Sequence, residues 1–283
     1  MQDLASNQIV QRIWTHDHTV WQPEPTEIDN RLGWLHSIET MRPKLSELQA
    51  FAEAIRAEGY TQALLLGMGG SSLAPEVFRV VFGVESGFLD LAVLDSTDPG
   101  AVLEFAERFE PAQTLFIVST KSGGTVETLS FFKFFYNLAL EKLGGEEVGK
   151  HFVAITDPGS KLEAIAAERG FRRCFLNDPN IGGRFSVLSY FGLVPAALLG
   201  LDLARLLDRG QKMAERCKFE NPAENPGARL GAIMGEAAAR GRDKLTLVAS
   251  PALAHFGAWV EQLIAESTGK EGKGILPVDG ETL

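Results

Sequence analysis

Three short segments rich in glycine, serine and threonine have the chemistry needed to bind an anion such as a phosphate group. They are GMGGSS at 67–72, STKSGGT at 119–125 and IGGRFS at 181–186. Glycines let backbone N–H groups approach an anion closely, and hydroxyls donate hydrogen bonds without adding charge. Each segment precedes a predicted helix, whose N-terminus adds partial positive charge.

The second segment is the most informative of the three. It places four hydroxyls, one lysine and two glycines directly before a predicted long helix. A helix cap needs only one or two such residues, and the spacing of a Walker P-loop is absent. The segment therefore predicts an uncharged cradle for a phosphate monoester.

The first segment fits two kinds of site. Ser71 and Ser72 supply hydroxyl donors, although serine is also a common helix cap. Gly67 and Gly69 partly match the dinucleotide-binding fingerprint, but Ser72 stands where its third glycine belongs. Asp95 ends the next predicted strand, at the place of a ribose-binding carboxylate. An NAD-dependent oxidoreductase is therefore an alternative.

Two charged residues stand at positions from which they could take part in catalysis. Arg184 lies in the third segment, and Glu266 lies near the end of the last predicted helix. The helix dipole disfavours a carboxylate there, so Glu266 is either a solvated side chain or a base with a raised pKa. The five histidines form no convincing metal spacing or catalytic triad; they are His16, His18, His36, His151 and His255. We expect no metal and no cofactor.

The elements that position these residues alternate between strand and helix across 61–200. Apolar strands are predicted at 63–66, 89–94, 114–119, 152–156 and 172–176, with helices at 73–82, 99–108, 126–143, 161–169 and 187–199. This order predicts an α/β fold, a three-layer αβα sandwich with a mainly parallel sheet. Ligands bind at the carboxyl ends of such strands, which is where the three segments fall.

The flanking regions differ from this central domain. Residues 1–60 are predicted to form an irregular arm and a helix over 37–58. Residues 201–283 are predicted to contain two linker helices, a buried strand at 244–249 and a helix at 253–267, with no element after it. One strand and one helix cannot form a core, so this region is interpreted as the truncated start of a second α/β domain.

Composition excludes several classes of protein. The 283 residues include 27 Lys and Arg against 37 Asp and Glu, a net charge of −10 that disfavours nucleic-acid and membrane partners. The two cysteines, Cys174 and Cys217, form no CxxC motif and are expected to be buried and unbridged. With no signal peptide and no membrane-spanning run in the sequence, we expect a cytoplasmic protein.

Four blocks together resemble the phosphoglucose isomerase family, whose members contain sugar-isomerase (SIS) domains. The blocks are GMGGSSLAPEVF, STKSGGTVET, GGRFS and ESTGK, in this order. The resemblance implies that Arg184 stabilises an enediol intermediate and that Glu266 moves a proton between C-2 and C-1 of the sugar. It implies a substrate-binding set of Gly70, Ser71, Thr120, Lys121 (through its backbone amide), Ser122, Thr125 and Gly183.

The implied activity interconverts glucose 6-phosphate and fructose 6-phosphate. The family also uses a histidine and a lysine from later segments, and no block before Leu283 matches either. We therefore expect binding of hexose 6-phosphate, with slow isomerisation or none by this chain alone. The arm at 12–35 resembles the joint of bifunctional transaldolase/phosphoglucose isomerase proteins, so a homodimer or a fused transaldolase domain is expected. A non-catalytic sugar-phosphate-sensing module is the other alternative.

Overall fold

The computed structural model describes residues 1–281 and divides into two compact units. The unit that we call the sheet unit combines Glu39–Pro179 and Gly183–Leu203. The other, which we call the terminal unit, combines Met1–Ile38, Asn180–Gly182 and Ala204–Leu283. These two units do not test the domain limits expected from the sequence (1–60, 61–200 and 201–283), which stay a prediction.

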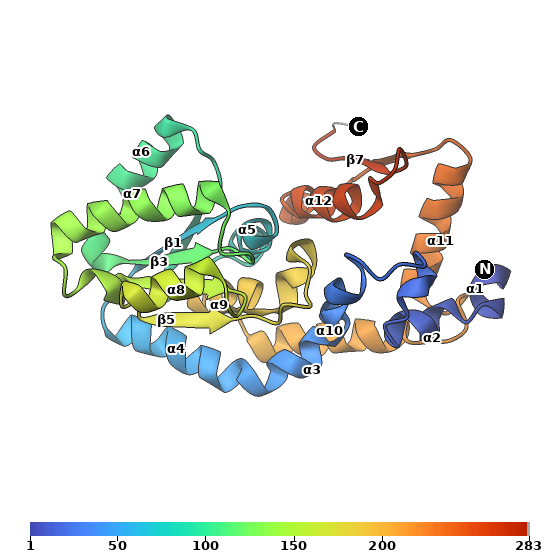
Figure 1. Cartoon of the computed structure of the whole chain (residues 1–283), viewed down its shortest axis with the longest axis horizontal. Coiled ribbons are helices and arrows are strands. Elements are labelled where there is room, and N and C mark those ends of the chain that lie inside the picture. The colour runs from blue at the N-terminus through green and yellow to red at the C-terminus, as the bar shows by residue number, and fades with distance from the viewer. Residues whose placement is uncertain (282–283) are drawn as a thin grey trace. The chain divides into compact units, whose positions relative to one another are not determined.

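A five-stranded parallel sheet forms the centre of the sheet unit (Figure 1). Its strand order is β2-β1-β3-β4-β5. The strands are β1 (Gln62–Gly67), β2 (Asp90–Leu94), β3 (Thr114–Ser119), β4 (Phe152–Thr156) and β5 (Arg173–Leu176). β3 and β4 are buried along their whole length, as expected for strands covered on both faces. The predicted α/β class is confirmed.

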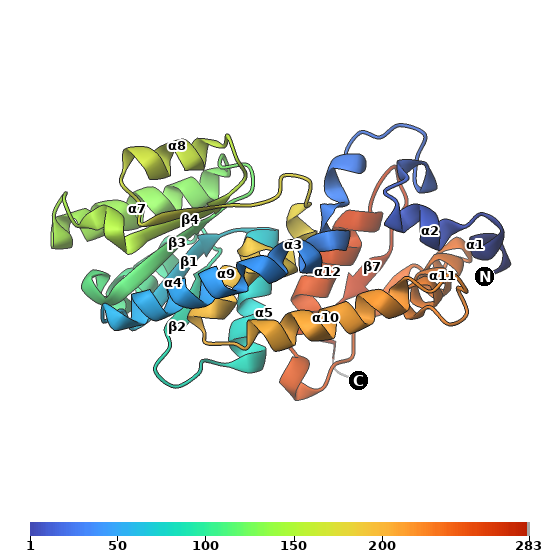
Figure 2. The same ribbon diagram turned by 90° about the horizontal axis from the view of Figure 1, so that it is seen from below.

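Helices cover both faces of this sheet, which gives three layers (Figure 2). One face carries α7 (Val126–Leu143) and α8 (Lys161–Glu168), and the other carries α4 (Leu45–Ala57), α5 (Leu73–Phe82) and α9 (Tyr190–Leu198). α6 (Pro99–Arg108) packs against the same core cluster as α7 and α8. Side chains alternate across a strand, so Leu64, Phe116 and Phe152 all enter the core under α7. Their burial stabilises the sheet by about 1.5–3 kcal/mol for each side chain.

The strand order places the candidate turns together. From β1 the chain moves to β2 on one side, and it then crosses over to β3 on the other side of β1. The connections that leave β1 and β3 therefore diverge, and such a switch point is the preferred ligand site of an open parallel sheet. Gly67 and Ser119, the last residues of these strands, are partners in register.

Of the helices expected around the central sheet, two differ from the structure by more than one residue. The helix expected over 37–58 is interrupted: α3 (Ser37–Met41) and α4 are separated by a 3₁₀ turn, Arg42–Lys44, which contains Pro43. Proline lacks the N–H that a continuous helix needs. The helix expected over 187–199 begins only at Tyr190, because Ser189 caps it by accepting a hydrogen bond from the Phe191 N–H at 3.3 Å.

The terminal unit contains short helices and a small sheet. Its elements are α1 (Gln2–Ser6), α2 (Ile9–Trp14), α10 (Leu203–Cys217), α11 (Pro226–Ala239), α12 (Phe256–Thr268), β6 (Lys244–Thr246) and β7 (Leu276–Val278). The strand expected at 244–249 is only three residues long and mostly exposed, so its predicted burial is wrong. The expectation of no strand after the last helix is also wrong, because β7 pairs in parallel with β6.

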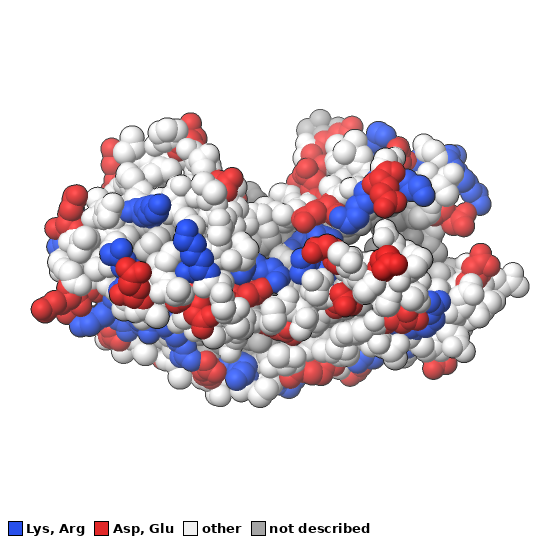
Figure 3. Space-filling model, in the orientation of Figure 1, with Lys and Arg blue, Asp and Glu red and all other residues white. Residues whose placement is uncertain are grey.

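Surface and membrane features were also expected from composition. None of the helices within residues 1–281 has the length and apolar character to cross a bilayer. On the face shown in Figure 3, basic side chains are interspersed with acidic ones.

Cys174 and Cys217 are unbridged, as expected, but only partly buried. Burial raises the pKa of the Cys174 thiol to about 11.

A buried histidine at the amino end of β4 should make stability depend on pH. His151 is 9% exposed, and its Nδ1 lies 3.3 Å from the Thr114 carbonyl oxygen. Burial lowers the pKa of His151 below its usual 6.5, so the unfolded chain binds the proton more readily. The free energy of unfolding should therefore fall as the pH drops below about 6.5.

Urea midpoints at about pH 7.5 and about pH 5.5 measure this loss. His151→Gln should reduce the difference between the two midpoints, whereas His255→Gln, at an exposed position, should leave it unchanged. An undiminished difference in His151→Gln would assign the pH dependence to other groups.

Candidate functional site

The turns that follow β1 and β3 are in direct contact. A Cβ at Gly67 would lie 3.1 Å from the Ser119 carbonyl oxygen and 3.3 Å from the Ser71 Cβ. The Ser119 hydroxyl donates to the Ser71 carbonyl at 3.4 Å. Two of the three candidate segments thus form one surface at the carboxyl ends of neighbouring strands.

The third turn packs against the first. A Cβ at Gly70 would lie 2.2 Å from the Gly183 carbonyl oxygen and 2.8 Å from the Arg184 nitrogen, so only glycine permits this approach. The Ser186 hydroxyl donates to the Gly183 carbonyl at 2.6 Å, which closes the third turn. The structure therefore brings all three turns together, and their role in binding stays a prediction.

Hydroxyls gather at the N-terminus of α7. Thr120 Oγ1 and Thr125 Oγ1 lie 2.8 Å apart, and Thr120 is only 3% exposed. The exposed Ser122 accepts a hydrogen bond from the Gly124 N–H at 3.2 Å through its hydroxyl oxygen. α7 begins at Val126, directly after these residues. An anion bound here would meet hydroxyl donors and the positive end of a long helix.

The Lys121 side chain is held within the protein. Its ammonium donates to Asp157 Oδ2 and, at 2.9 Å, to the Pro179 carbonyl oxygen. The expected contact of the Lys121 backbone amide with a phosphate group stays a prediction. Asp157 was not selected from the sequence, although DPGS at 157–160 directly follows a predicted strand, the same signal that selected the other turns.

Ser71 and Ser72 have different surroundings. Ser72 is fully buried, and its hydroxyl donates to the Gly69 carbonyl at 3.0 Å, which stabilises its own turn. Ser71 is 8% exposed. Asp95, the candidate ribose ligand of the oxidoreductase alternative, lies exposed just beyond β2.

The two candidate catalytic residues belong to different compact units. Arg184, in the sheet unit, is partly exposed, and its guanidinium carbon lies 4.6 Å from the centroid of the Phe185 ring. Glu266, in the terminal unit, is exposed in the last turn of α12. The approach of Glu266 to the three turns therefore stays a prediction.

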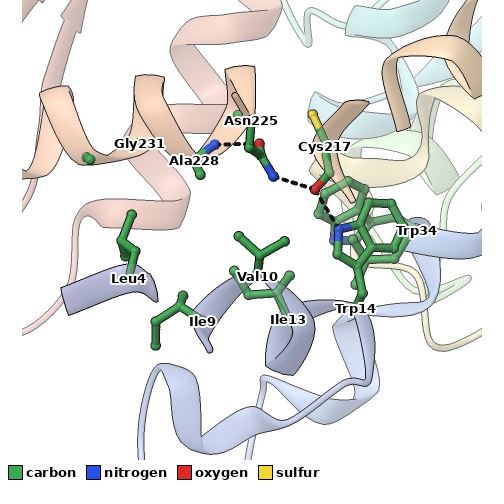
Figure 4. A pocket seen from close by; sticks show the side chains of 13 residues that line it. Leu4, Ile9, Val10, Ile13, Trp14, Trp34, Cys217, Asn225, Ala228 and Gly231 are labelled. Carbon is green, nitrogen blue, oxygen red and sulfur yellow. Dashed lines mark hydrogen bonds between the residues drawn. The ribbon is translucent and has the colours of Figure 1, made fainter. Parts of the chain in front are cut away.

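The terminal unit contains a cavity of a different character (Figure 4). It encloses about 380 Å³, and α1, α2 and α11 contribute mainly apolar side chains to its lining. Its polar groups bond to each other: Trp14 Nε1 and Asn225 Nδ2 both donate to the Cys217 carbonyl oxygen, at 2.9 and 2.7 Å. Such a lining does not suit a phosphate group. Within residues 1–281, no three His, Cys, Asp or Glu side chains are grouped to hold a metal ion.

Comparison with known proteins identifies the family. The family model described as phosphoglucose isomerase matches residues 36–275. The chain belongs to the phosphoglucose isomerase family. A glucose-6-phosphate isomerase of Carboxydothermus hydrogenoformans is 34% identical over 250 residues, which cover 84% of this chain and 53% of that protein. The chain spans about half the length of the curated relatives it matches.

Two solved structures have a fold similar to that of this chain. A hypothetical protein from Thermus thermophilus matches with a TM-score of 0.84 and 29% identity, over 98% of this chain and 66% of that chain. A glucose-6-phosphate isomerase from Chlamydia trachomatis matches with a TM-score of 0.75 and 23% identity, over 96% of this chain and 53% of the other. At that identity the second match speaks for the fold alone.

Proposed function

We propose that this chain binds hexose 6-phosphate and contributes to the interconversion of glucose 6-phosphate and fructose 6-phosphate. The observation that carries the proposal is the meeting of three turns at the β1/β3 switch point, with Thr120 and Thr125 at the start of α7. Membership of the phosphoglucose isomerase family supports the choice of substrate.

The proposed roles follow from the chemistry of moving a proton next to a carbonyl group. The phosphate group is held by hydroxyls and backbone N–H groups of the first two turns, which fixes the sugar without a metal ion. Glu266 removes the proton from C-2 and returns it to C-1, and Arg184 stabilises the negative charge that develops on oxygen in the enediol. The groups that open the sugar ring are not assigned in this chain.

We further propose that fast turnover needs groups from outside this chain. These groups are the histidine and the lysine that no block of this chain matches. The protein is expected to act in the cytoplasm, as a homodimer or fused to a transaldolase domain. Under this proposal the purified chain binds hexose 6-phosphate but isomerises it slowly. Rapid coupled turnover of fructose 6-phosphate by the chain alone would contradict the need for a partner.

Calorimetric titration with glucose 6-phosphate tests the binding step. Thr125→Val should lower the affinity about tenfold or more, because a hydrogen bond to a charged group is worth about 1.5–3 kcal/mol. Thr61→Val is the matched control, because Thr61 is exposed at the amino end of β1. Equal binding by wild type and Thr125→Val would remove this turn from the site.

Two ligand experiments separate the alternatives. A non-catalytic sensing module would bind the sugar phosphate without exchange of solvent deuterium at C-2. An oxidoreductase would be stabilised against thermal unfolding by NAD rather than by glucose 6-phosphate. Stabilisation by NAD alone would overturn the isomerase proposal.

A further inference from the structure

Lys121 and Asp157 form an ion pair beside the proposed phosphate-binding turn. Their side chains are only 23% and 13% exposed, so the pair is largely withdrawn from solvent. Asp157 directly follows β4, the strand next to β3. The same ammonium also donates to Pro179, which follows β5. One side chain thus links the carboxyl ends of three adjacent strands.

Backbone contacts reinforce the same link. The Thr120 N–H donates to the Ile155 carbonyl at 3.1 Å, and the Asp157 N–H donates to the Lys121 carbonyl at 3.1 Å. The Thr156 hydroxyl donates to that carbonyl as well, at 3.3 Å. The path of the turn at 119–121 is therefore determined from the neighbouring strand before any ligand binds.

The start of α8 supports the far end of the turn. Gly123 has a φ of +67°, and a Cβ there would lie 2.7 Å from the Leu162 nitrogen. The Ser160 hydroxyl lies 2.8 Å from that of Thr156, so the residues that contact Gly123 are themselves held in place. On this side the turn is therefore packed closely against the start of α8.

We infer that Asp157 is a positioning residue for the phosphate-binding turn. It holds the Lys121 ammonium away from the anion and holds the turn in the shape that presents uncharged donors. This inference rests on the proposed function. A turn ordered in advance binds more tightly, because less conformational entropy is lost on binding.

The opposite role for Lys121 makes a different prediction. If the ammonium contacted the phosphate directly, Asp157 would compete with the anion for it. Removing the Asp157 charge would then tighten binding. If Asp157 positions the turn, removing its charge weakens binding. The sign of the change in affinity therefore decides between the two roles.

The experiment measures the affinity of the full chain for inorganic phosphate and for glucose 6-phosphate. Asp157→Asn should weaken both about tenfold, and Asp157→Glu should recover part of the loss. Lys121→Met should also weaken binding, and the double variant should bind no more weakly than Lys121→Met, because both changes act through one ion pair.

The control is a second lysine–carboxylate pair. Lys150 Nζ and Glu147 Oε1 lie 2.8 Å apart, but the two side chains are 57% and 55% exposed. The pair lies just before β4, at the amino ends of the strands and not at the carboxyl ends where the three turns lie. Lys150→Met should leave both affinities unchanged. Circular dichroism verifies that each variant folds. If Asp157→Asn does not fold, Lys121→Arg replaces it, because arginine keeps the positive charge. Lys121→Arg should then bind both ligands more tightly than Lys121→Met.

The outcomes separate this inference from the proposed function. Unchanged or tighter binding by Asp157→Asn, or equal binding by Lys121→Arg and Lys121→Met, overturns the positioning role while the proposed function stands. A folded wild-type chain that binds neither ligand overturns the proposed function, and this inference with it.

Discussion

Replacing Gly70 by alanine should strongly weaken sugar-phosphate binding and destabilise the sheet unit. The new Cβ would lie 2.2 Å from the Gly183 carbonyl oxygen and 2.4 Å from its carbonyl carbon, which are backbone atoms that cannot rotate away. Separating the first and third turns should lower the free energy of unfolding by about 2–3 kcal/mol. Loss of two hydrogen bonds to the phosphate should lower the affinity about a hundredfold.

Gly235→Ala is the matched control for this change. Gly235 lies in α11, where a Cβ would meet nothing within 4 Å. Alanine also favours a helix over glycine by about 1 kcal/mol, so this variant should be as stable as wild type or more stable. Urea unfolding and calorimetric titration measure both effects. Normal affinity in Gly70→Ala would show that contact between the turns is not needed for binding.

Glu266→Gln should abolish proton transfer while sparing ligand binding. Glutamine keeps the shape of the side chain but cannot accept a proton at neutral pH, and loss of a general base costs about 100- to 10,000-fold in rate. The rate is measured as uptake of solvent deuterium at C-2 of bound glucose 6-phosphate. This readout does not require the ring-opening groups to complete a full turnover.

The comparison variant for Glu266 is on the same helix. Glu261, five residues earlier in α12, is also exposed. Glu261→Gln should exchange deuterium at the wild-type rate. If Glu266→Gln did so too, Glu266 would not be the base, and the assignment from the ESTGK block would fail. A wild-type chain that binds but never exchanges would favour the sensing module.

Much of the central fold could be predicted from the sequence. The predicted bounds of α5, α6, α7, β3 and β4 coincide with the observed ones. These elements have strong local signals: continuous apolar runs for strands buried on both faces, apolar spacing for helices, and proline at the start of α6. The three Gly, Ser and Thr turns were found because they follow such strands.

Other features depended on contacts between distant segments. The pairing of β6 with β7 joins strands about thirty residues apart, and each strand has only three residues. Because so short a run has no clear period of its own, its neighbour decides whether it becomes a strand. The partner of Lys121 was missed for a similar reason: Asp157 lies 36 residues away, and only the order of β3 and β4 brings the two together.

By itself, the sequence determined which residues could bind a phosphate group, because backbone freedom, hydroxyl donors and helix starts are properties of a few consecutive residues. The tertiary structure alone decided that β1 lies beside β3, that Gly70 touches Gly183, and that the Lys121 ammonium is directed to Asp157. These contacts depend on the path of the chain across the sheet, and many distant side chains determine that path together through their burial.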